Sequence, residues 1–334
     1  MRAWNHAVHG EPIEVLSIAE VAEPVPGPGQ VAIQVAACGL NFADALLCRG
    51  TYQVKPPLPS VPGIEVTGTV LRVGPGADPA RVGERVVALP TLPHGGLAEV
   101  CLASASDAWT VPDGAGDDPV DDVTAAAVTI TYGTAWVGLF HRGALRPGDT
   151  VLVHAAAGAT GAAAVQLAVA AGARVLATAG GPVKVAQARE HGAALAWDSR
   201  AEGFDIVGLV REATGGRGVD VVFDPVGGEL FDASRRVVAF EGRYVVVGNA
   251  SGRVPLLPTN HLLVKNYAVV GLHWGLYRDQ RPEVLRAAHD AVMAKVAAGR
   301  LRPAIGAVVA FEEAAGAIAA IAAGTTSGKL VVTI

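Results

Sequence analysis

The sequence predicts an α/β protein with a doubly wound parallel sheet and a second, β-rich domain. In the middle of the chain, short apolar runs alternate with helical patterns, which is typical of successive βαβ units. The first part instead carries β-branched runs separated by prolines, which is typical of strands joined by loops. With 334 residues, the chain is long enough for both domains.

The β-rich part extends to about residue 122. Its expected strands have β-branched character and cover residues 31–37, 64–73 and 85–89. Prolines at 24, 26 and 28 and a proline cluster at 56–59 separate these strands. A segment of this kind shapes the surroundings of a cleft and does not build a parallel sheet.

The alternating pattern begins near residue 123. The expected strands cover residues 151–155, 174–178, 219–223 and 243–248. The expected helices between them cover residues 160–171, 182–191 and 228–239. Right-handed crossovers between parallel strands then give a doubly wound sheet. Further along, we expect a strand at 267–272, helices at 282–299 and 311–323, and a final strand at 329–333.

The composition excludes several classes of protein. The chain is 51% hydrophobic and 17% charged, which argues against a disordered protein. Its net charge of −5 argues against nucleic acid as the main partner. The scattered cysteines Cys38, Cys48 and Cys101 have no spacing typical of disulfides or zinc ligands. We expect them to be free thiols in a reducing cytoplasm.

Membrane insertion is the alternative raised by two uncharged stretches, residues 123–140 and 150–173. The first contains four threonines, a tyrosine and two glycines, and the second contains a histidine and a glycine turn. These features favour buried elements over membrane spans. The N-terminus also lacks the basic and then apolar order of a signal peptide, so we expect a cytoplasmic protein without membrane contact.

A glycine turn between an apolar run and an alanine-rich helix predicts a dinucleotide site. The motif is Ala156-x-Gly158-x-x-Gly161, an alanine-first version of G-x-G-x-x-G. Alone it is equally consistent with close helix–sheet packing, but a strand before it and a helix after it favour cofactor binding. The residues expected to meet the pyrophosphate are Ala157, Gly158, Ala159, Thr160 and Gly161.

The end of the second strand indicates which dinucleotide binds. An NAD site usually has an acidic residue here, whereas this chain has Ala179 followed by Gly180. Lys184 lies just beyond, and Arg200, before the strand expected at 219–223, is a second candidate for a 2′-phosphate. The charges therefore favour NADPH, with NADH as the second choice. A solvated helix position is the alternative reading of Lys184.

Glycine-bearing turns also end two later strands. They are Asp224-Pro225-Val226-Gly227-Gly228 and Val247-Gly248-Asn249. Because ligands bind beyond the carboxyl ends of parallel strands, both turns could admit the ribose and nicotinamide. Ordinary turn chemistry explains them equally well.

With these residues in view, the chain resembles the quinone oxidoreductase branch of the medium-chain dehydrogenase/reductase superfamily. The resemblance covers essentially the whole chain in ordered motifs: Asn41-Phe42-Ala43-Asp44, Arg49-Gly50-Thr51-Tyr52, Pro59-Ser60-Val61-Pro62-Gly63-Ile64-Glu65, Val82-Gly83-Glu84-Arg85-Val86, Thr134-Ala135-Trp136, His154-Ala155-Ala156-Ala157-Gly158, Thr214-Gly215-Gly216-Arg217-Gly218-Val219-Asp220-Val221-Val222, Gly248-Asn249-Ala250-Ser251-Gly252 and Gly328-Lys329.

The resemblance implies a Rossmann cofactor domain at 125–271, inserted into a GroES-like catalytic domain formed by 1–124 and 272–334. It implies NADPH as the cofactor, with Asn41, Thr134 and Lys329 among the residues that bind it. It also implies a homodimer that pairs through the sheet edge at residues 267–274. Two departures from the family pattern, Ser199 and Gly324, remove a tyrosine and an arginine that often contact the 2′-phosphate.

Many members of the superfamily use catalytic zinc, so the ligand positions are informative. By resemblance, the two cysteines and the histidine of those enzymes correspond to Asn41, Ile64 and Ile130. None of these is a plausible thiolate or imidazole ligand, and the four-cysteine structural zinc lobe is absent from the sequence. We therefore expect no metal.

Without zinc, the hydride acceptor must already be electron-poor, as quinones and α,β-unsaturated carbonyl compounds are. The protein must then position the acceptor and donate a hydrogen bond to the oxygen that gains charge. We assign this role to Tyr52, with Asn41 as a second donor; a core tyrosine is the competing interpretation of Tyr52. Asp44, Arg49 and Glu65 are interpreted as structural ion pairs or turn caps.

The expected function is NADPH-dependent reduction of quinones or related electron-poor carbonyl compounds. One alternative is an NADPH-dependent enone or enoyl-thioester reductase, which reduces C=C bonds. Another, of a different class, is a non-catalytic NADPH-binding protein. The physiological acceptor and the one- or two-electron outcome do not follow from the sequence.

Overall fold

The structure, a computed structural model, describes residues 1–112, 114 and 120–334. It divides into two compact units: unit 1 comprises Met1–Ile130 and Met293–Ile334, and unit 2 comprises Thr131–Val292. The boundaries therefore fall later in the chain than those we expected at 124/125 and 271/272. The first is later because helix α3 (Asp122–Ala126) packs Ala126 against Ala37 and Val331 of unit 1.

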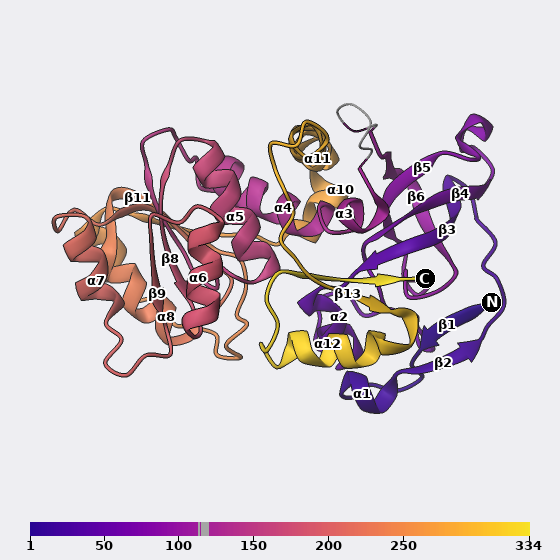
Figure 1. The fold of residues 1–334 in the computed structure, drawn as a ribbon, viewed down its shortest axis with the longest axis horizontal. Helices are drawn as coiled ribbons and strands as arrows, with labels where there is room; N and C mark the ends of the chain where they lie inside the picture. The colour runs from indigo at the N-terminus through magenta and orange to yellow at the C-terminus, as the bar shows by residue number, and fades with distance from the viewer. Residues whose placement is uncertain (113, 115–119) are drawn as a thin grey trace. The chain divides into compact units, whose positions relative to one another are not determined.

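Unit 1 is built on a six-stranded sheet with the order β13-β14-β3-β4-β5-β6, and a further pairing of β3 with β6 closes β3 to β6 into a barrel. All neighbours except β13 and β14 are antiparallel. In Figure 1 the yellow C-terminal segment runs beside β3, so residues from both ends of the chain share one sheet. The strands of unit 1 are β1 (Arg2–Asn5), β2 (Ser17–Glu20), β3 (Gln30–Gly39), β4 (Val66–Val73), β5 (Arg85–Pro90), β6 (Val100–Thr110), β13 (Ile305–Ala310) and β14 (Lys329–Thr333).

Short helices pack against this barrel. The apolar core beneath them draws on β3, β4 and β6 and on the face of α12 that carries Ala314 and Ile318. The helical elements are α1 (Pro12–Val15), α2 (Phe42–Cys48), η1 (Pro79–Arg81), α3, η5 (Phe311–Glu313) and α12 (Ala314–Ala322). This is the β-rich domain that the sequence predicts, although α2 and the strands β6 and β13 were not predicted.

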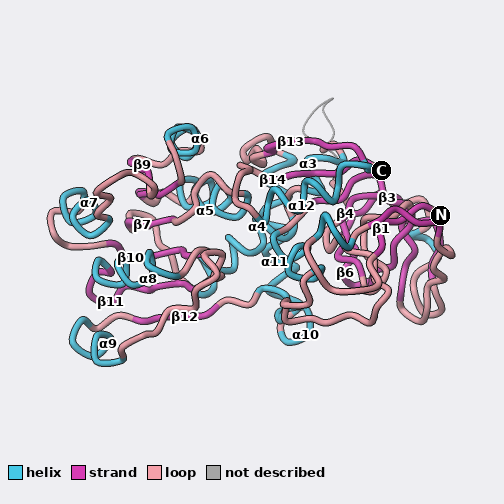
Figure 2. The backbone as a smooth tube through the Cα atoms, turned by 90° about the horizontal axis from the view of Figure 1, so that it is seen from below, coloured by secondary structure: helices cyan, strands magenta, loops and turns pink. Residues whose placement is uncertain are grey.

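Unit 2 contains a six-stranded parallel sheet with the order β12-β11-β10-β7-β8-β9. Figure 2 shows its labelled strands one above another, with β9 and β12 at opposite edges. The strands are β7 (Thr150–Val153), β8 (Arg174–Ala179), β9 (Leu195–Asp198), β10 (Val219–Asp224), β11 (Val238–Val246) and β12 (Ala268–Gly271). The order reverses at β7, which is the topological switch point of a doubly wound fold.

Helices cover both faces of this sheet, because right-handed crossovers on the two sides of β7 fall on opposite faces. One apolar core contains side chains of α7, α8 and α9 packed on the sheet, among them Val210, Phe231 and Leu262. The helical elements that begin in or enter unit 2 are α4 (Thr129–Trp136), η2 (Val137–Arg142), α5 (Ala159–Ala170), α6 (Pro182–Glu190), α7 (Ile206–Ala213), α8 (Gly228–Ser234), η3 (Arg235–Val237), α9 (Thr259–Lys265), η4 (Trp274–Leu276), α10 (Tyr277–Gln280) and α11 (Pro282–Ala297). The predicted fold class is confirmed.

Two neighbouring predicted elements were wrong in their extent. We expected a helix over residues 228–239 and a strand over residues 243–248, but α8 ends at Ser234, and strand β11 covers Val238–Val246. Val238 is paired with Val219 of β10 and is buried, so tertiary packing of a β-branched pair ends the helix. Within the described residues, no helix is long and apolar enough to span a membrane.

Candidate functional site

The glycine turn follows β7 directly. All four residues of β7 are buried, and the chain then turns at Ala155, which has a positive φ of 51°. The Ala156 N–H donates to Thr178 O of β8 at 2.9 Å, and Gly158 caps the N-terminus of α5. The turn therefore carries the chain from the central strand straight into a helix whose first N–H groups point out of its N-terminus.

Gly161 shows why this turn needs glycine. A Cβ atom at Gly161 would lie 2.1 Å from Ala155 O, so only glycine allows α5 to approach the turn so closely. The predicted pyrophosphate residues Ala157, Gly158, Ala159 and Thr160 occupy the turn and the first turn of α5, next to Gly161. Backbone N–H groups and the helix dipole here can bind an anion.

A buried histidine directly before the glycine turn connects three elements through hydrogen bonds. His154 is fully buried, with Nδ1 2.8 Å from Thr178 Oγ1 and Nε2 2.9 Å from Ser234 Oγ. Burial lowers the pKa of His154, so the imidazole is neutral and donates from one nitrogen while it accepts at the other. The three side chains link β7, β8 and α8 beneath the site.

The end of β10 is shaped by Asp224, which is fully buried. Its carboxylate accepts hydrogen bonds from Val226 N (2.8 Å), Gly227 N (2.9 Å) and the hydroxyl of Tyr244 (2.7 Å). Burial, together with this carboxylate, raises the pKa of Tyr244 well above its usual value, so the phenol remains a donor.

The turn after β11 is hydrogen-bonded to the end of β10. The N–H groups of Val247 and Gly248 donate to Asp224 O at 2.8 and 3.3 Å. A Cβ at Gly227 would lie 2.6 Å from Asn249 Oδ1, so that turn and Asn249 are in close contact. The structure thus brings the predicted residues Val247, Gly248 and Asn249 together at the carboxyl edge of the sheet.

Beyond β8 and β9, a cationic site lies at the same edge. A Cβ at Gly180 would lie 2.8 Å from Arg200 Nε, which places the guanidinium over this glycine. Lys184 is half-buried, and burial together with the charge of Arg200 lowers its pKa, so the two cations are neighbours. We expected both to bind a 2′-phosphate, and the structure brings them together.

Asp198, at the end of β9, was not singled out from the sequence. Its Oδ1 accepts hydrogen bonds from Arg200 N (2.8 Å) and Gly181 N (2.7 Å), and these N–H groups lower its pKa. The carboxylate therefore orders the loop that carries Arg200. Its sequence signal was an acidic residue two positions before a cation at the end of a strand.

A separate cluster of buried polar residues lies in unit 1. Lys329 Nζ donates to Glu65 Oε2 at 2.6 Å and to Asn41 Oδ1 at 2.7 Å, and Lys329 and Glu65 are almost completely buried. Glu65 Oε1 accepts from Ile130 N at 2.7 Å. Gly39 makes room for the lysine, since a Cβ there would lie 2.8 Å from Lys329 Cε. The predicted residues Asn41 and Lys329 are therefore in direct contact.

The side chain of Asn41 is fully engaged in this cluster. Its Nδ2 lies 3.0 Å from Gly39 O and 3.3 Å from Glu65 Oε2, so both amide hydrogens have acceptors. The backbone N–H of Asn41 donates to Asp44 Oδ2. Burial raises the pKa of Asp44 to about 6. The arrangement leaves the amide of Asn41 no spare hydrogen for an acceptor molecule.

The cluster includes Asn41 and Ile130, two of the three positions that we expected from the resemblance to correspond to zinc ligands, and Glu65 directly follows the third, Ile64. Among the residues that the structure describes, no group of three or more His, Cys, Asp or Glu side chains could hold a metal ion.

The remaining predicted residues lie on two further elements. Tyr52 is half-buried in the loop after α2, and its N–H donates to Leu46 O at 3.2 Å. The loop packs on His9, because a Cβ at Gly50 would lie 2.7 Å from that ring. Thr134 is buried on α4 in unit 2.

Family models match both parts of the chain. Residues 27–113 match the alcohol dehydrogenase GroES-like domain, and residues 159–290 match the zinc-binding dehydrogenase family. Quinone oxidoreductase-like protein 2 of Bos taurus is 38% identical over 335 residues, covering 100% of this chain and 93% of that protein.

Two other similar proteins are informative. The quinone oxidoreductase of Thermus thermophilus, solved alone and with NADPH, is 35% identical with a TM-score of 0.83 and full coverage of both chains. Phthioceranic/hydroxyphthioceranic acid synthase of Mycobacterium tuberculosis is 35% identical over 327 residues, which cover 96% of this chain but 15% of that protein. The resemblance predicted from the sequence motifs is confirmed: the chain belongs to the medium-chain dehydrogenase/reductase superfamily and is similar to its quinone oxidoreductases.

Proposed function

We propose that this protein reduces quinones or related electron-poor carbonyl compounds with NADPH, without zinc. The observation that carries the cofactor assignment is the single edge of the unit 2 sheet that presents both the Gly161 turn and the Lys184–Arg200 pair. The turn suits a pyrophosphate, and the cations suit a 2′-phosphate. The bound nicotinamide would supply the hydride, and every other requirement falls on side chains of this chain.

The proposed roles combine the geometry within each unit with what the resemblance implies. Ala157, Gly158, Ala159, Thr160 and Gly161 bind the pyrophosphate, whereas Gly180, Lys184 and Arg200 bind the adenosine phosphate. Val247, Gly248, Asn249 and Thr134 surround the nicotinamide half, and Asn41 and Lys329 complete the cofactor contacts. Because the amide of Asn41 is saturated, we assign the hydrogen bond to the acceptor oxygen to the Tyr52 hydroxyl and give Asn41 the task of positioning Lys329.

The test is the steady-state oxidation of NADPH by the purified protein. We expect turnover with 1,4-benzoquinone that exceeds turnover with cyclohexenone or crotonyl-CoA, and no loss of turnover after treatment with a chelator. Stoichiometric zinc that is required for turnover would contradict the proposal. Tyr52→Phe removes the hydroxyl and should lower kcat with the quinone; unchanged turnover would remove Tyr52 from the mechanism.

A second candidate function is NADPH-dependent reduction of C=C bonds in enones or enoyl thioesters. It is favoured by the similarity to part of an acid synthase, since a protein that makes a carboxylic acid handles acyl substrates. Strong preference for crotonyl-CoA over the quinone in the same assay would establish it. Tight NADPH binding without reduction of any acceptor would instead support a non-catalytic NADPH-binding protein.

We also propose a homodimer that forms through β12. Within the described residues this edge strand pairs with β11 alone, and edge strands need a partner or protection. Strongly exposed apolar side chains lie on the neighbouring loop and on α9: Val254 (71% exposed), Leu256 (86%), Leu263 (78%) and Val264 (77%). Light scattering coupled to size exclusion should give twice the mass of one chain, and Val270→Lys should give a monomer.

A further inference from the structure

Tyr52, to which we assign the hydrogen bond to the acceptor oxygen, lies in the loop directly after α2. The loop begins with a Schellman motif, in which Gly50 has a positive φ of 67°. The Gly50 N–H donates to Leu47 O at 3.0 Å, and the Thr51 N–H donates to Leu46 O at 2.9 Å. The position of Tyr52 therefore depends on how the C-terminal end of α2 is held.

The segment of residues 9–11 packs against this end of α2. A Cβ at Gly50 would lie 2.7 Å from Cγ and Cδ2 of His9, so the imidazole ring lies against the turn of the Schellman motif. The Gly10 N–H donates to Cys48 O at 2.9 Å. This carbonyl is one of the last four of α2, which have no partner within the helix.

A bidentate ion pair joins the same two segments. The Glu11 carboxylate accepts hydrogen bonds from Arg49 Nε (2.8 Å) and Nη2 (2.7 Å). These bonds lower the pKa of the Glu11 carboxyl, so the pair is charged at neutral pH. Because the side chains of Arg49 and Glu11 are 31% and 52% exposed, the pair contributes little to overall stability. Its planar geometry instead fixes the end of α2 relative to residues 9–11.

We propose that His9, Glu11 and Arg49 are positioning residues, which fix the loop after α2 and thereby place the Tyr52 hydroxyl for its hydrogen bond to the acceptor oxygen. This inference rests on the proposed function, in which Tyr52 donates that bond. The three side chains act through the loop and not on the acceptor itself. A misplacement of about 1 Å can lower a rate by up to about 100-fold, so small shifts of the loop matter.

The first experiment removes each contact separately. Glu11→Ala removes the ion pair, and His9→Ala removes the ring against Gly50. Each should lower kcat with 1,4-benzoquinone by about 3- to 30-fold and leave the Kd for NADPH unchanged. Glu23→Ala is the matched control, because it also removes a partly exposed carboxylate of unit 1 that is paired with an arginine, and it should leave both constants unchanged.

A conservative variant separates the packing of His9 from proton transfer. His9→Phe keeps a flat ring against Gly50 but has no nitrogen that could carry a proton. It should therefore retain nearly the full kcat that His9→Ala loses. Equal losses in the two variants would contradict a positioning role for the ring.

The decisive experiment is a double-mutant cycle with Tyr52→Phe. If Glu11 acts through the Tyr52 hydroxyl, Glu11→Ala should lower kcat no further once that hydroxyl is absent. Losses that multiply in the double variant would overturn the inference, because Glu11 would then act independently of Tyr52. Melting temperatures and the Kd for NADPH show that the variants are folded.

Failure of the inference is distinguishable from failure of the proposed function. If the unchanged protein reduces no acceptor, or if Tyr52→Phe is as fast as the unchanged protein, the role proposed for Tyr52 fails. If Tyr52→Phe is slow but Glu11→Ala and His9→Ala match the Glu23→Ala control, only the positioning role fails.

Discussion

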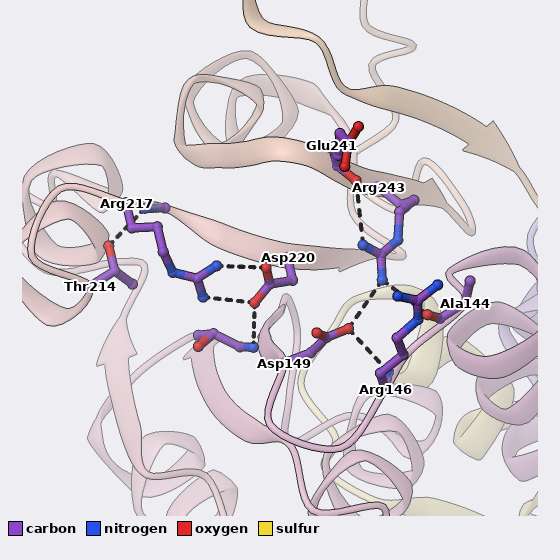
Figure 3. Close-up of polar contacts among 10 residues, drawn as sticks. Ala144, Arg146, Asp149, Thr214, Arg217, Asp220, Glu241 and Arg243 are labelled. Atoms are coloured by element: carbon purple, nitrogen blue, oxygen red, sulfur yellow. Dashed lines mark hydrogen bonds and ion pairs between the residues drawn. The ribbon is translucent and has the colours of Figure 1, made fainter.

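The two ends of the parallel sheet in unit 2 are built in contrasting ways. At the amino end, charged side chains satisfy one another (Figure 3). Arg217 donates to both carboxylate oxygens of Asp220 at 2.7 and 2.8 Å, and Asp220 also accepts from Thr150 N at 2.8 Å. Arg243 contacts Asp149 at 3.1 Å and donates to Gly143 O at 2.7 Å. These contacts join the starts of β7 and β10 to Arg243, which lies within β11.

At the carboxyl end, fewer of the charged side chains are paired with one another. The guanidinium of Arg200 makes no hydrogen bond or ion pair within the described residues, and glycines replace side chains where the turns approach one another. His154 and Asp224 are the side chains that are hydrogen-bonded within the chain at this end. Both are buried, and their hydrogen bonds hold the neighbouring turns in place. The contrast teaches that the charged groups at one end of the sheet satisfy one another, whereas the other end is where we propose that the cofactor binds.

The largest effect should come from the carboxyl end. In Gly161→Ala the new Cβ meets Ala155 O at 2.1 Å, so α5 or the turn must move. We expect at least about 100-fold weaker NADPH binding by isothermal titration calorimetry, since displaced N–H groups no longer reach the pyrophosphate. Gly316→Ala, at an open helical position in unit 1, is the control and should bind NADPH normally. Normal binding by Gly161→Ala would show that the turn does not hold the cofactor.

A second effect at the same end concerns the choice of cofactor. Arg200→Ala removes a charge from the proposed phosphate site and should raise the Kd for NADPH by about 10- to 100-fold while leaving that for NADH unchanged. Arg211→Ala makes the same change of charge at an exposed position on α7 and should alter neither. Equal losses for both dinucleotides would remove Arg200 from the phosphate site.

The amino end should respond in the opposite manner. Asp220→Ala leaves Arg217 and the Thr150 N–H without their acceptor and should lower the free energy of unfolding by about 1–3 kcal/mol, measured by urea denaturation. The Kd for NADPH should not change. Asp290→Ala, which removes an exposed ion pair with Arg286, should have no measurable effect on unfolding. A change in the Kd of Asp220→Ala would show that the two ends are coupled.

The smallest effect is a pH dependence from the carboxyl end. Burial lowers the pKa of His154 below the ordinary 6.5, so the unfolded chain binds a proton that the folded chain excludes. The contribution of His154 to stability is complete above pH 6.5 and is lost as the pH falls, by at most about 1.4 kcal/mol per pH unit. His154→Gln should flatten the decline in urea midpoint between about pH 6.5 and pH 5. An identical slope in both proteins would show that His154 does not titrate on unfolding.

Most of unit 2 could be predicted from the sequence because its signals are local. Each βαβ unit is encoded by a short apolar run, a turn and a helix in succession, and the glycine turn combines all three within residues 150–171. Unit 1 was predicted less completely. Strand β6 is paired with β3 and β5, and strand β13 with β14, so the partners that make them strands are distant in sequence.

The candidate site also combines residues with local sequence signals and contacts between residues that are distant in sequence. Gly158, Gly161 and Gly180 were expected at the cofactor because small residues at strand ends have a local meaning. The saturation of the Asn41 amide could not be predicted, because its partner Lys329 lies 288 positions away in the chain. The partner of Arg49 could likewise not be predicted, because Glu11 lies 38 positions away.

The sequence by itself determined the alternation of strands and helices in unit 2, the place of the glycine turn and the family. Those properties follow from spacing and from residue size within a few consecutive turns of chain. Only the tertiary structure decided which polar groups are paired and which remain available, because hydrogen bonds and burial are settled by residues that meet through folding and not through proximity in sequence.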